Sequence, residues 1–174
     1  MQHMILTILY DKIMSKQIQT TKVRNRIYTD SLAYEIKLTE KYSKMLGLQL
    51  FAKLNAPISP EEFIVLDATS CNPDICQRDL AKLLIKDRAN TGRLLESLEK
   101  KEYIKRIIDV KNNRLVKRII LTEAGDKIYK EILEKIIPVL DKAFESFTEE
   151  EVTQAKKFLK KMRDTLENIV DLQI

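Results

Sequence analysis

The 174-residue sequence predicts a mainly α-helical fold with one small β-hairpin. Only three glycines and four prolines are present, which favours long helices with few tight turns. Apolar residues recur at spacings of three and four over several long stretches, as in amphipathic helices. The exceptions are two runs rich in β-branched residues, 103–109 and 114–121, which a polar turn separates.

The N-terminal part divides into an extension, 1–27, and a long helix followed by a linker, 28–58. The extension could be a loose helix, a basic arm or partly a start-site artefact. The helix carries two apolar stripes, one of Leu32, Ile36, Leu46, Leu50 and Leu54 and one of Tyr34, Leu38, Tyr42 and Met45. A helix that is apolar on two sides needs cover on both. We therefore expect a second copy of the chain on one side; the alternative is the central helix of a monomer.

A second region, 59–121, begins with a strong helix start. Ser59 has the side chain of an N-cap, Pro60 suits the first helical position, and Glu62 completes a capping box. This helix should place Phe63, Leu66 and Ala68 inward and end near Pro73.

Two short helices joined by a tight turn follow. The first, 77–84, has Leu80, Leu83 and Leu84 on its apolar side. After the turn 85–87, Asp87 should cap a second helix, 88–101. That helix turns Leu94, Leu95 and Leu98 inward and carries polar and basic residues in its first two turns. The hairpin comes next, so the order is that of a helix–turn–helix with a wing.

The C-terminal part, 122–174, contains two further helices. Thr122 should cap the first, about 123–146, and Thr148 with Glu151 forms a second capping box. The last helix has an apolar seam of Val152, Ala155, Leu159, Met162, Leu166 and Ile169. This seam suits packing against helices of a second copy, although an ordinary intramolecular helix has similar spacing.

The net charge of +5 is unevenly distributed. Residues 76–121 contain 13 Lys/Arg and six Asp/Glu, a net +7, whereas the remainder is −2. A solvated charged face is one interpretation. A basic excess confined to a helix–turn–helix and wing instead indicates binding to nucleic acid.

Several classes of function are disfavoured. His3 is the only histidine, so we expect no histidine-based metal site or catalytic triad. A glycine-rich phosphate loop is absent, and we expect neither an enzyme nor a cofactor. No apolar run approaches the ~18 residues of a membrane span. The apolar segment at 4–9 lacks the basic region and cleavage site of a secretion signal, so we expect a cytoplasmic protein.

Several short motifs follow one another along the chain: Ser59-Pro60-Glu61-Glu62-Phe63 with Leu66, Gln77-Arg78-Asp79-Leu80-Ala81, Asp87-Arg88-Ala89, Arg93-Leu94, Leu98-Glu99-Lys100-Lys101, Asn113-Arg114 and Leu121-Thr122-Glu123-Ala124-Gly125. Their order and spacing resemble the MarR family of winged helix–turn–helix transcription regulators. The resemblance covers about 28–169.

The resemblance implies a homodimer that binds a pseudo-palindromic double-stranded DNA operator; we expect a repressor. Its recognition helices would enter successive major grooves and its wings the flanking minor grooves. The DNA-binding positions implied are Gln77, Arg78, Lys86, Arg88, Asn90, Thr91, Arg93, Lys111, Asn112, Asn113 and Arg114. The sequence departs from the family at Ile85 and Glu102, where glycine is usual, and at Asn113, where aspartate is usual.

Side-chain chemistry suggests a role for eight of these positions. Arg88 and Asn90 are the best candidates for reading bases, because Arg pairs with guanine and Asn with adenine. Arg93 would contact a base or a phosphate, and Thr91 a thymine methyl group or a phosphate. Arg114 would fit a narrow minor groove. Lys86, Arg78 and Lys111 would contact phosphates. For every one of them the alternative is a solvated polar residue.

Gly92 lies among these positions and also has two interpretations. It could permit a close approach of the helix backbone to DNA, or it could be a tolerated helix glycine.

Two inputs could release the DNA. Cys76 stands at a helix start, where a thiol can be more reactive, and Cys71 is five residues away. The two could sense oxidants, or both could be small reduced core residues. The other family-typical input is a small phenolic or aromatic effector in a crevice lined by Tyr34, Tyr42, Leu46, Phe63 and Leu66, positions that could equally be plain core. A winged helix can also serve protein–protein assembly, without reading DNA.

Overall fold

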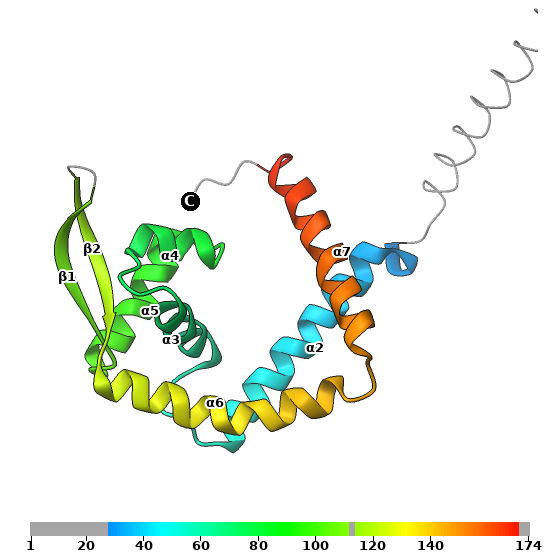
Figure 1. Cartoon of the computed structure of the whole chain (residues 1–174), viewed down its shortest axis with the longest axis horizontal. Helices are drawn as coiled ribbons and strands as arrows, with labels where there is room; N and C mark the ends of the chain where they lie inside the picture. Colours follow the sequence, from blue (N-terminus) through cyan, green and yellow to red (C-terminus); the bar gives the residue numbers. More distant parts are fainter. Residues whose placement is uncertain (1–27, 112–113, 171–174) are drawn as a thin grey trace, which may run out of the picture. The chain divides into compact units, whose positions relative to one another are not determined.

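The computed structural model describes residues 28–111 and 114–170 and confirms a mainly helical fold with one two-stranded antiparallel hairpin (Figure 1). In chain order the elements are the 3-10 helix η1 (Tyr28–Asp30), α2 (Leu32–Lys53), α3 (Pro60–Cys71), α4 (Gln77–Leu83), α5 (Arg88–Lys100), β1 (Ile104–Lys111), β2 (Arg114–Leu121), α6 (Glu123–Phe144) and α7 (Glu149–Glu167). The predicted extension, 1–27, lies outside the described residues. None of the helices in these ranges combines the length and the apolar content that crossing a bilayer requires.

The chain forms two compact units, with the boundary between Gln49 and Leu50. In the first unit, Ser31 separates η1 from α2, and its hydroxyl accepts a hydrogen bond from the Tyr34 amide at 3.2 Å. The long predicted helix therefore begins at Leu32 rather than at Tyr28. Several of its apolar side chains are exposed in the single chain: Leu32, Tyr42, Met45, Leu46 and Leu48.

The core of the second unit lies where α3, α5, the base of the hairpin and α6 meet. Its buried members are Phe51, Ile58, Val65, Leu66, Ala68, Leu80, Leu95, Leu98, Ile104, Ile119, Tyr129, Ile132 and Ile136. The predicted capping box of α3 is confirmed. The Ser59 amide donates to Glu62 Oε2 at 2.7 Å, and the Glu62 amide donates to Ser59 Oγ at 3.2 Å.

One predicted core position is wrong. Leu80 is fully buried and Leu84 is half-buried, but Leu83 is 53% exposed. Because α4 is only seven residues long, it turns a single narrow side toward the core, and Leu83 falls outside that side.

Three helices end with the same backbone geometry, a left-handed residue immediately after the C-cap. These residues are Asn55 (φ 48°), Ile85 (φ 49°) and Glu102 (φ 61°). After α5, the Glu102 amide donates to the Glu99 carbonyl and the Tyr103 amide to the Leu98 carbonyl, both at 3.0 Å. This pair of hydrogen bonds is the Schellman motif, which normally uses glycine at the left-handed position. The absence of glycine at Ile85 and Glu102 therefore leaves the cap geometry in place.

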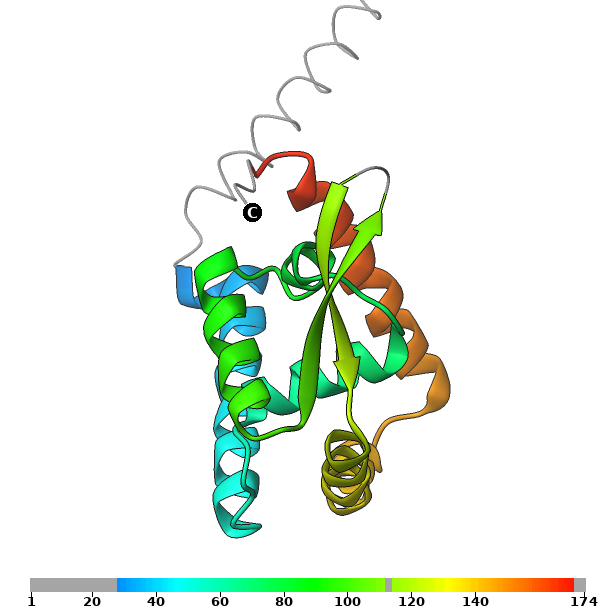
Figure 2. The same cartoon turned by 90° about the vertical axis from the view of Figure 1, so that its left-hand side faces the viewer.

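The hairpin lies beside α5 (Figure 2) and pairs β1 with β2 from Ile104↔Leu121 to Lys111↔Arg114. The segment before α4 pairs with β2 at a single position. The Ile119 amide donates to the Ile75 carbonyl at 3.0 Å, and Cys76 forms an isolated bridge with Arg118. The hairpin is thus attached to the start of the helix–turn–helix.

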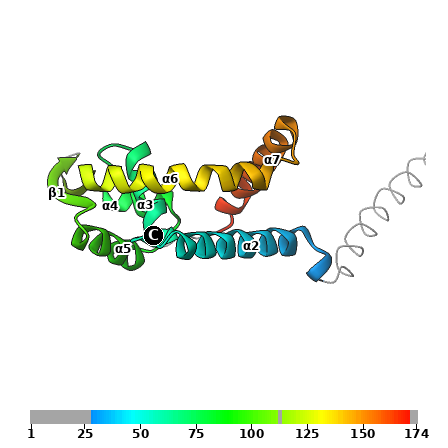
Figure 3. The ribbon, with the colours of Figure 1, turned by 90° about the horizontal axis from the view of Figure 1, so that it is seen from below.

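Figure 3 shows α6 along its length, from its start near the hairpin to its end before α7. Thr122 caps this helix, and its hydroxyl accepts from the Gly125 amide at 3.0 Å. A Cβ at Gly125 would lie 1.9 Å from the Tyr103 carbonyl oxygen, so only glycine permits this approach. The predicted capping box of α7 is also confirmed, because Thr148 and Glu151 bond reciprocally. Along α7 the apolar seam has no fully buried member; Leu159 is 40% and Leu166 44% exposed.

Candidate nucleic-acid interface

The N-terminal end of α5 is fixed by Asp87. Its carboxylate accepts from the Asn90 backbone amide at 2.8 Å, and the Asn90 side-chain amide donates to the same carboxylate. The hydrogen bond from the Asn90 backbone, with smaller contributions from its side chain and from the Arg93 charge, holds the pKa of Asp87 below its usual range. The predicted cap is confirmed, and it orients the Asn90 side chain as well as the helix.

The first two turns of α5 present their polar side chains to solvent. Arg88, Asn90 and Arg93 are all exposed. Thr91 is not: it is fully buried, and its hydroxyl donates to the Asp87 carbonyl at 2.9 Å. Thr91 lies four and seven residues before the buried Leu95 and Leu98, so it shares the buried side of the helix, and this position gives no support to the predicted DNA contact.

The second half of α5 is anchored to α3. The buried Glu62 carboxylate accepts from Ser97 Oγ at 2.6 Å and from Lys101 Nζ at 2.8 Å. Burial raises the pKa of Glu62, but the hydrogen bonds from Lys101, Ser97 and the Ser59 amide outweigh it and hold the pKa below its ordinary 4.5. Sequence reasoning assigned Glu62 only to the α3 cap; the contact with α5 depends on the tertiary fold.

A second link joins α5 to the hairpin. The Glu99 carboxylate accepts from Arg106 Nε at 2.9 Å, and the guanidinium forms a further contact through its NH2 group. The Arg106 side chain lowers the pKa of Glu99 through these hydrogen bonds and its charge. α5 and the hairpin are consequently fixed to each other.

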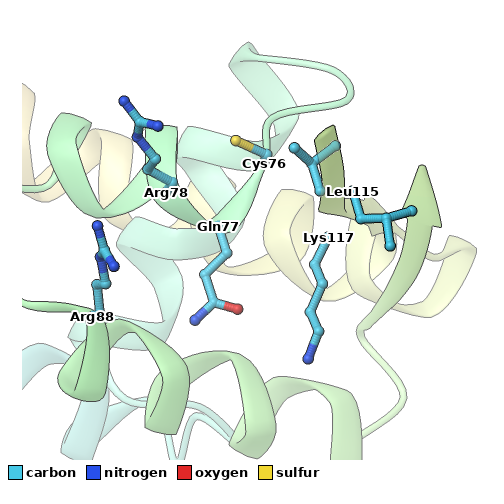
Figure 4. A pocket seen from close by; sticks show the side chains of 7 residues that line it. Cys76, Gln77, Arg78, Arg88, Leu115 and Lys117 are labelled. Carbon is cyan, nitrogen blue, oxygen red and sulfur yellow. The ribbon is translucent and has the colours of Figure 1, made fainter. Parts of the chain in front are cut away.

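A pocket of about 370 Å³ opens between the start of α4, the start of α5 and β2. It is lined by Cys76, Gln77, Arg78, Arg88, Leu115, Val116 and Lys117. Figure 4 shows Arg78 and Arg88 on one side and Leu115 and Lys117 on the other, with Gln77 between them. Among the described residues that line the pocket there are three cations and no carboxylate.

Comparisons with known proteins agree with this geometry. The MarR family profile matches residues 58–116. The uncharacterized HTH-type transcriptional regulators YybA and YsmB of Bacillus subtilis strain 168 are 29% identical over 96 residues and 30% identical over 106 residues. These stretches cover 55% and 61% of this chain and 63% and 72% of the relatives, so the match to YybA spans less than two thirds of that protein. The crystal structure of an S. aureus MepR–DNA complex superposes with a TM-score of 0.69 at 25% identity, over 80% of this chain and 99% of that one.

The chain belongs to the MarR family. This family and its winged-helix fold are those of transcriptional regulators, not of enzymes.

The other predicted DNA-binding positions of this MarR-family chain have varied surroundings. Arg78 is exposed and lines the pocket. Gln77 is half-buried, and its Nε2 would lie 3.6 Å from a Cβ built on Gly92. Lys86 pairs with Glu61 of α3 at 3.4 Å. A phosphate would have to compete with Glu61 for Lys86, so Lys86 is less available than Arg78.

The tip of the wing is only partly described. Asn112 and Asn113 lie outside the described residues, and so do the side chains of Lys111 and Arg114, although both belong to strands. Below the tip, Arg118 pairs with Asp109 at 2.7 Å and with Asp74 at 3.1 Å, which ties β2 to β1 and to the segment before α4. Sequence reasoning missed Leu115 and Lys117, whose place in the pocket depends on the hairpin register.

The structure also shows the surroundings of the cysteines and of two residues of the suggested effector crevice. Cys71 is exposed at the end of α3, Cys76 is buried beside the pocket, and both thiols are free. Phe63 packs between Phe51 and Tyr129, with ring centroids 5.7 and 5.5 Å apart. Leu66 is fully buried in the core. Phe63 and Leu66 therefore pack as ordinary core residues, which was the alternative to a role in an effector crevice.

Proposed function

We propose that this chain is a cytoplasmic, sequence-specific transcriptional regulator that binds double-stranded DNA as a homodimer on a pseudo-palindromic operator, most simply as a repressor. One observation carries the proposal. The start of α5 holds Arg88, Asn90 and Arg93 exposed on a helix whose opposite side is fixed in the core. Arginine and asparagine form the bidentate pairs that distinguish guanine and adenine in a major groove. The similar S. aureus protein MepR forms a complex with DNA, which supports DNA binding by this chain.

Arg88 and Asn90 are the proposed base readers, with Arg93 on a base or a phosphate and Arg78 on a phosphate. Asp87 already accepts one hydrogen of the Asn90 side-chain amide. The second amide hydrogen and the carbonyl oxygen are the two groups that adenine requires. Arg114 is proposed for the minor groove and Lys111, Asn112 and Asn113 for the wing tip.

Homodimerisation is supported by apolar side chains that are exposed to solvent in the single chain. On α7 these include Phe158, Leu159 and Leu166, and on α2 they include Tyr42, Met45 and Leu46. Burial of such surface stabilises association by roughly 25 cal/mol per Å². Two copies would present two α5 helices to one duplex, about one helical turn apart.

Replacement of Arg88 by alanine tests the base-reading role. The preferred duplex is first obtained by selection from a random pool. Arg88→Ala should weaken binding to it by ~1–3 kcal/mol and relax one base position, with a much smaller loss on unrelated DNA. Lys127→Ala is a control, because it removes one positive charge at an exposed position of α6. Equal losses on preferred and unrelated DNA would contradict base reading by Arg88.

We propose two alternative signals that release the protein from DNA, a small phenolic or aromatic ligand and oxidation of the cysteines. Cys76 lines the pocket together with Arg78 and Arg88, so a change at this thiol would alter the proposed interface directly. Under thiol control, peroxide should weaken DNA binding by the wild type but not by the Cys71→Ser/Cys76→Ser double variant. An unchanged wild-type affinity after peroxide would remove this alternative.

The competing function is protein–protein assembly, in which the basic surface meets an acidic partner. It predicts no preferred duplex. A DNA reader instead loses affinity steeply with salt yet keeps a preferred site.

A further inference from the structure

The register of the hairpin determines where each backbone group of β1 points. Tyr103 and Thr122 lie opposite each other just before the paired strands, and the Thr122 amide donates to the Tyr103 carbonyl at 3.1 Å. Hydrogen-bonded and non-hydrogen-bonded pairs alternate along an antiparallel ladder. Every second residue of β1 therefore directs its N–H and C=O groups away from β2. These residues are Ile104, Arg106, Ile108 and Val110.

Part of the outward-facing backbone of the hairpin already has partners. The edge of β2 is covered by the segment before α4. On β1, which is the strand farther from α4 (Figure 1), the Arg106 amide donates to Glu99 Oε1 at 3.3 Å. Within residues 28–111 and 114–170, no hydrogen bond reaches the outward N–H and C=O groups of Ile108 and Val110. The edge of β1 is therefore open at these two residues.

The side chains along the open edge are apolar and exposed. Ile108 is 73% and Val110 61% exposed on one face of the hairpin, and Ile107 is 41% exposed on the other face. Successive side chains of a strand alternate between the two faces of a sheet. An open edge with exposed apolar side chains is a template for pairing with another strand.

The charges that remain unpaired beside this edge are positive. Asp109 pairs with Arg118 of β2 at 2.7 Å. Of the charged hairpin residues whose side chains the structure describes, the two without an ion pair are Lys105 and Lys117, and both are exposed. A strand that complements the edge therefore combines apolar side chains with carboxylates.

We propose that the open edge of β1, defined as Ile107, Ile108 and Val110, binds an extended acidic segment of a partner protein, which adds a strand to the hairpin. The N–H and C=O groups of Ile108 and Val110 pair with that segment, whose apolar side chains lie on the same face as theirs. The intervening residues of the segment lie on the other face, with a carboxylate near Lys105. This inference adds a protein partner to the proposed DNA-binding function and does not depend on it.

A second copy of β1 fits the edge less well. Two antiparallel copies that use both free positions pair Ile108 of each with Val110 of the other, which places the two Asp109 residues opposite each other. Like charges directly opposite each other on a sheet are destabilising. The register that sets Ile108 against Ile108 instead requires the Arg106 amide, which is already bonded to Glu99.

The probe is a short, capped and fluorescent peptide of alternating valine and glutamate, added to the full-length wild type. Peptide residues that bond to β1 place their side chains on the face of Ile108 and Val110, so the valines take these positions. One derivative carries N-methyl groups on the valine nitrogens, and its matched control carries them on the glutamate nitrogens. The valine-methylated peptide should lose binding because its donors to β1 are blocked. The glutamate-methylated peptide should bind, because those nitrogens point to solvent.

Val110→Pro tests the same edge on the protein, with Val110→Ala as its matched control. Proline removes the outward N–H but no hydrogen bond to β2, and edge strands tolerate it. Val110→Pro should weaken binding of the unmethylated peptide at least about fivefold, the effect of one lost backbone hydrogen bond. Val110→Ala keeps the donor and should weaken binding less. Urea unfolding of both variants shows whether the fold is retained, and the methylated peptides test the edge on the wild type in either case.

Three results would overturn the inference. The valine–glutamate peptide could fail to bind, or the two methylated peptides could bind equally, which would indicate attraction by charge without strand pairing. Sedimentation could show a wild-type assembly larger than that of Val110→Pro, which would assign the edge to a second copy of the chain. Selection of a preferred duplex tests the DNA-binding function separately, so each proposal can fail alone.

Discussion

Glu102 has a left-handed backbone conformation, and its side chain is exposed to solvent. It lies at φ 61° directly after α5, and its backbone carbonyl accepts from Thr122 Oγ1 at 2.7 Å. An L-residue in this conformation costs roughly 1–2 kcal/mol, whereas glycine adopts it freely. Glycine in turn loses about 0.5–1 kcal/mol through the greater freedom of the unfolded chain. Since the Glu102 side chain is exposed, Glu102→Gly should stabilise the protein by about 0.5–1 kcal/mol.

Glu102→Ala is the matched control, because alanine removes the same side chain but keeps the left-handed cost. Urea unfolding followed by circular dichroism, at one fixed protein concentration, gives the free energy for each variant. The free energy of unfolding should be higher for Glu102→Gly than for the wild type, and that of Glu102→Ala should be close to the wild type. A glycine variant no more stable than the alanine variant would refute the explanation from backbone conformation.

Three further predictions concern stability and its dependence on pH. Glu62→Gln should cost about 2 kcal/mol, since it breaks a buried contact with a Lys101 side chain that is itself a third exposed. Because the pKa of Glu62 is lowered on folding, its contribution is present above pH 4.5 and is lost below it, so urea unfolding at falling pH should bring variant and wild type together. Burial and the 2.8 Å hydrogen bond to Asp67 raise the pKa of Tyr129 from 10.0 to about 12. The free energy of unfolding of the wild type should therefore fall as the pH rises between these two pKa values, whereas that of Tyr129→Phe should not show this fall. Gly92→Ala should stabilise by about 0.5–1 kcal/mol, because a Cβ there makes only ordinary contact.

Each of these predictions has a contradicting result. A constant difference between Glu62→Gln and the wild type across acidic pH would deny the ionised contact. Parallel alkaline unfolding curves for Tyr129→Phe and wild type would deny the raised pKa. A Gly92→Ala variant that is no more stable than the wild type would contradict the stabilisation expected from alanine. If the variant is more stable but binds the preferred duplex less tightly, the glycine serves a close approach to DNA; unchanged binding identifies a tolerated helix glycine.

The helix starts could be predicted because their signals are local. Ser59, Thr122 and Thr148 each cap the helix that the sequence assigns to them, and so does Asp87. An N-cap needs only one oxygen within three residues of the amides that it accepts from, so short-range sequence contains the information. The hairpin was predictable for a similar reason, since a polar turn separates two β-rich runs.

The features that sequence reasoning missed depend on contacts between distant residues. Thr91 resembled a polar surface residue, but its position one turn before Leu95 places it on the buried side of α5. Lys117 joins Arg78 and Arg88 only because the hairpin register and the bridge at Cys76 bring β2 beside α4. Both features require the packing of α5 and the hairpin, which no local pattern specifies.

Selection of bound duplexes from a random pool tests the central claim most directly. The full-length wild type should enrich one sequence with two inverted half-sites whose centres lie about 10 base pairs apart, the spacing at which two α5 helices meet one side of the duplex. Recovery of the starting pool, with no sequence enriched at any salt concentration, would contradict the account of α5 as a reader of DNA.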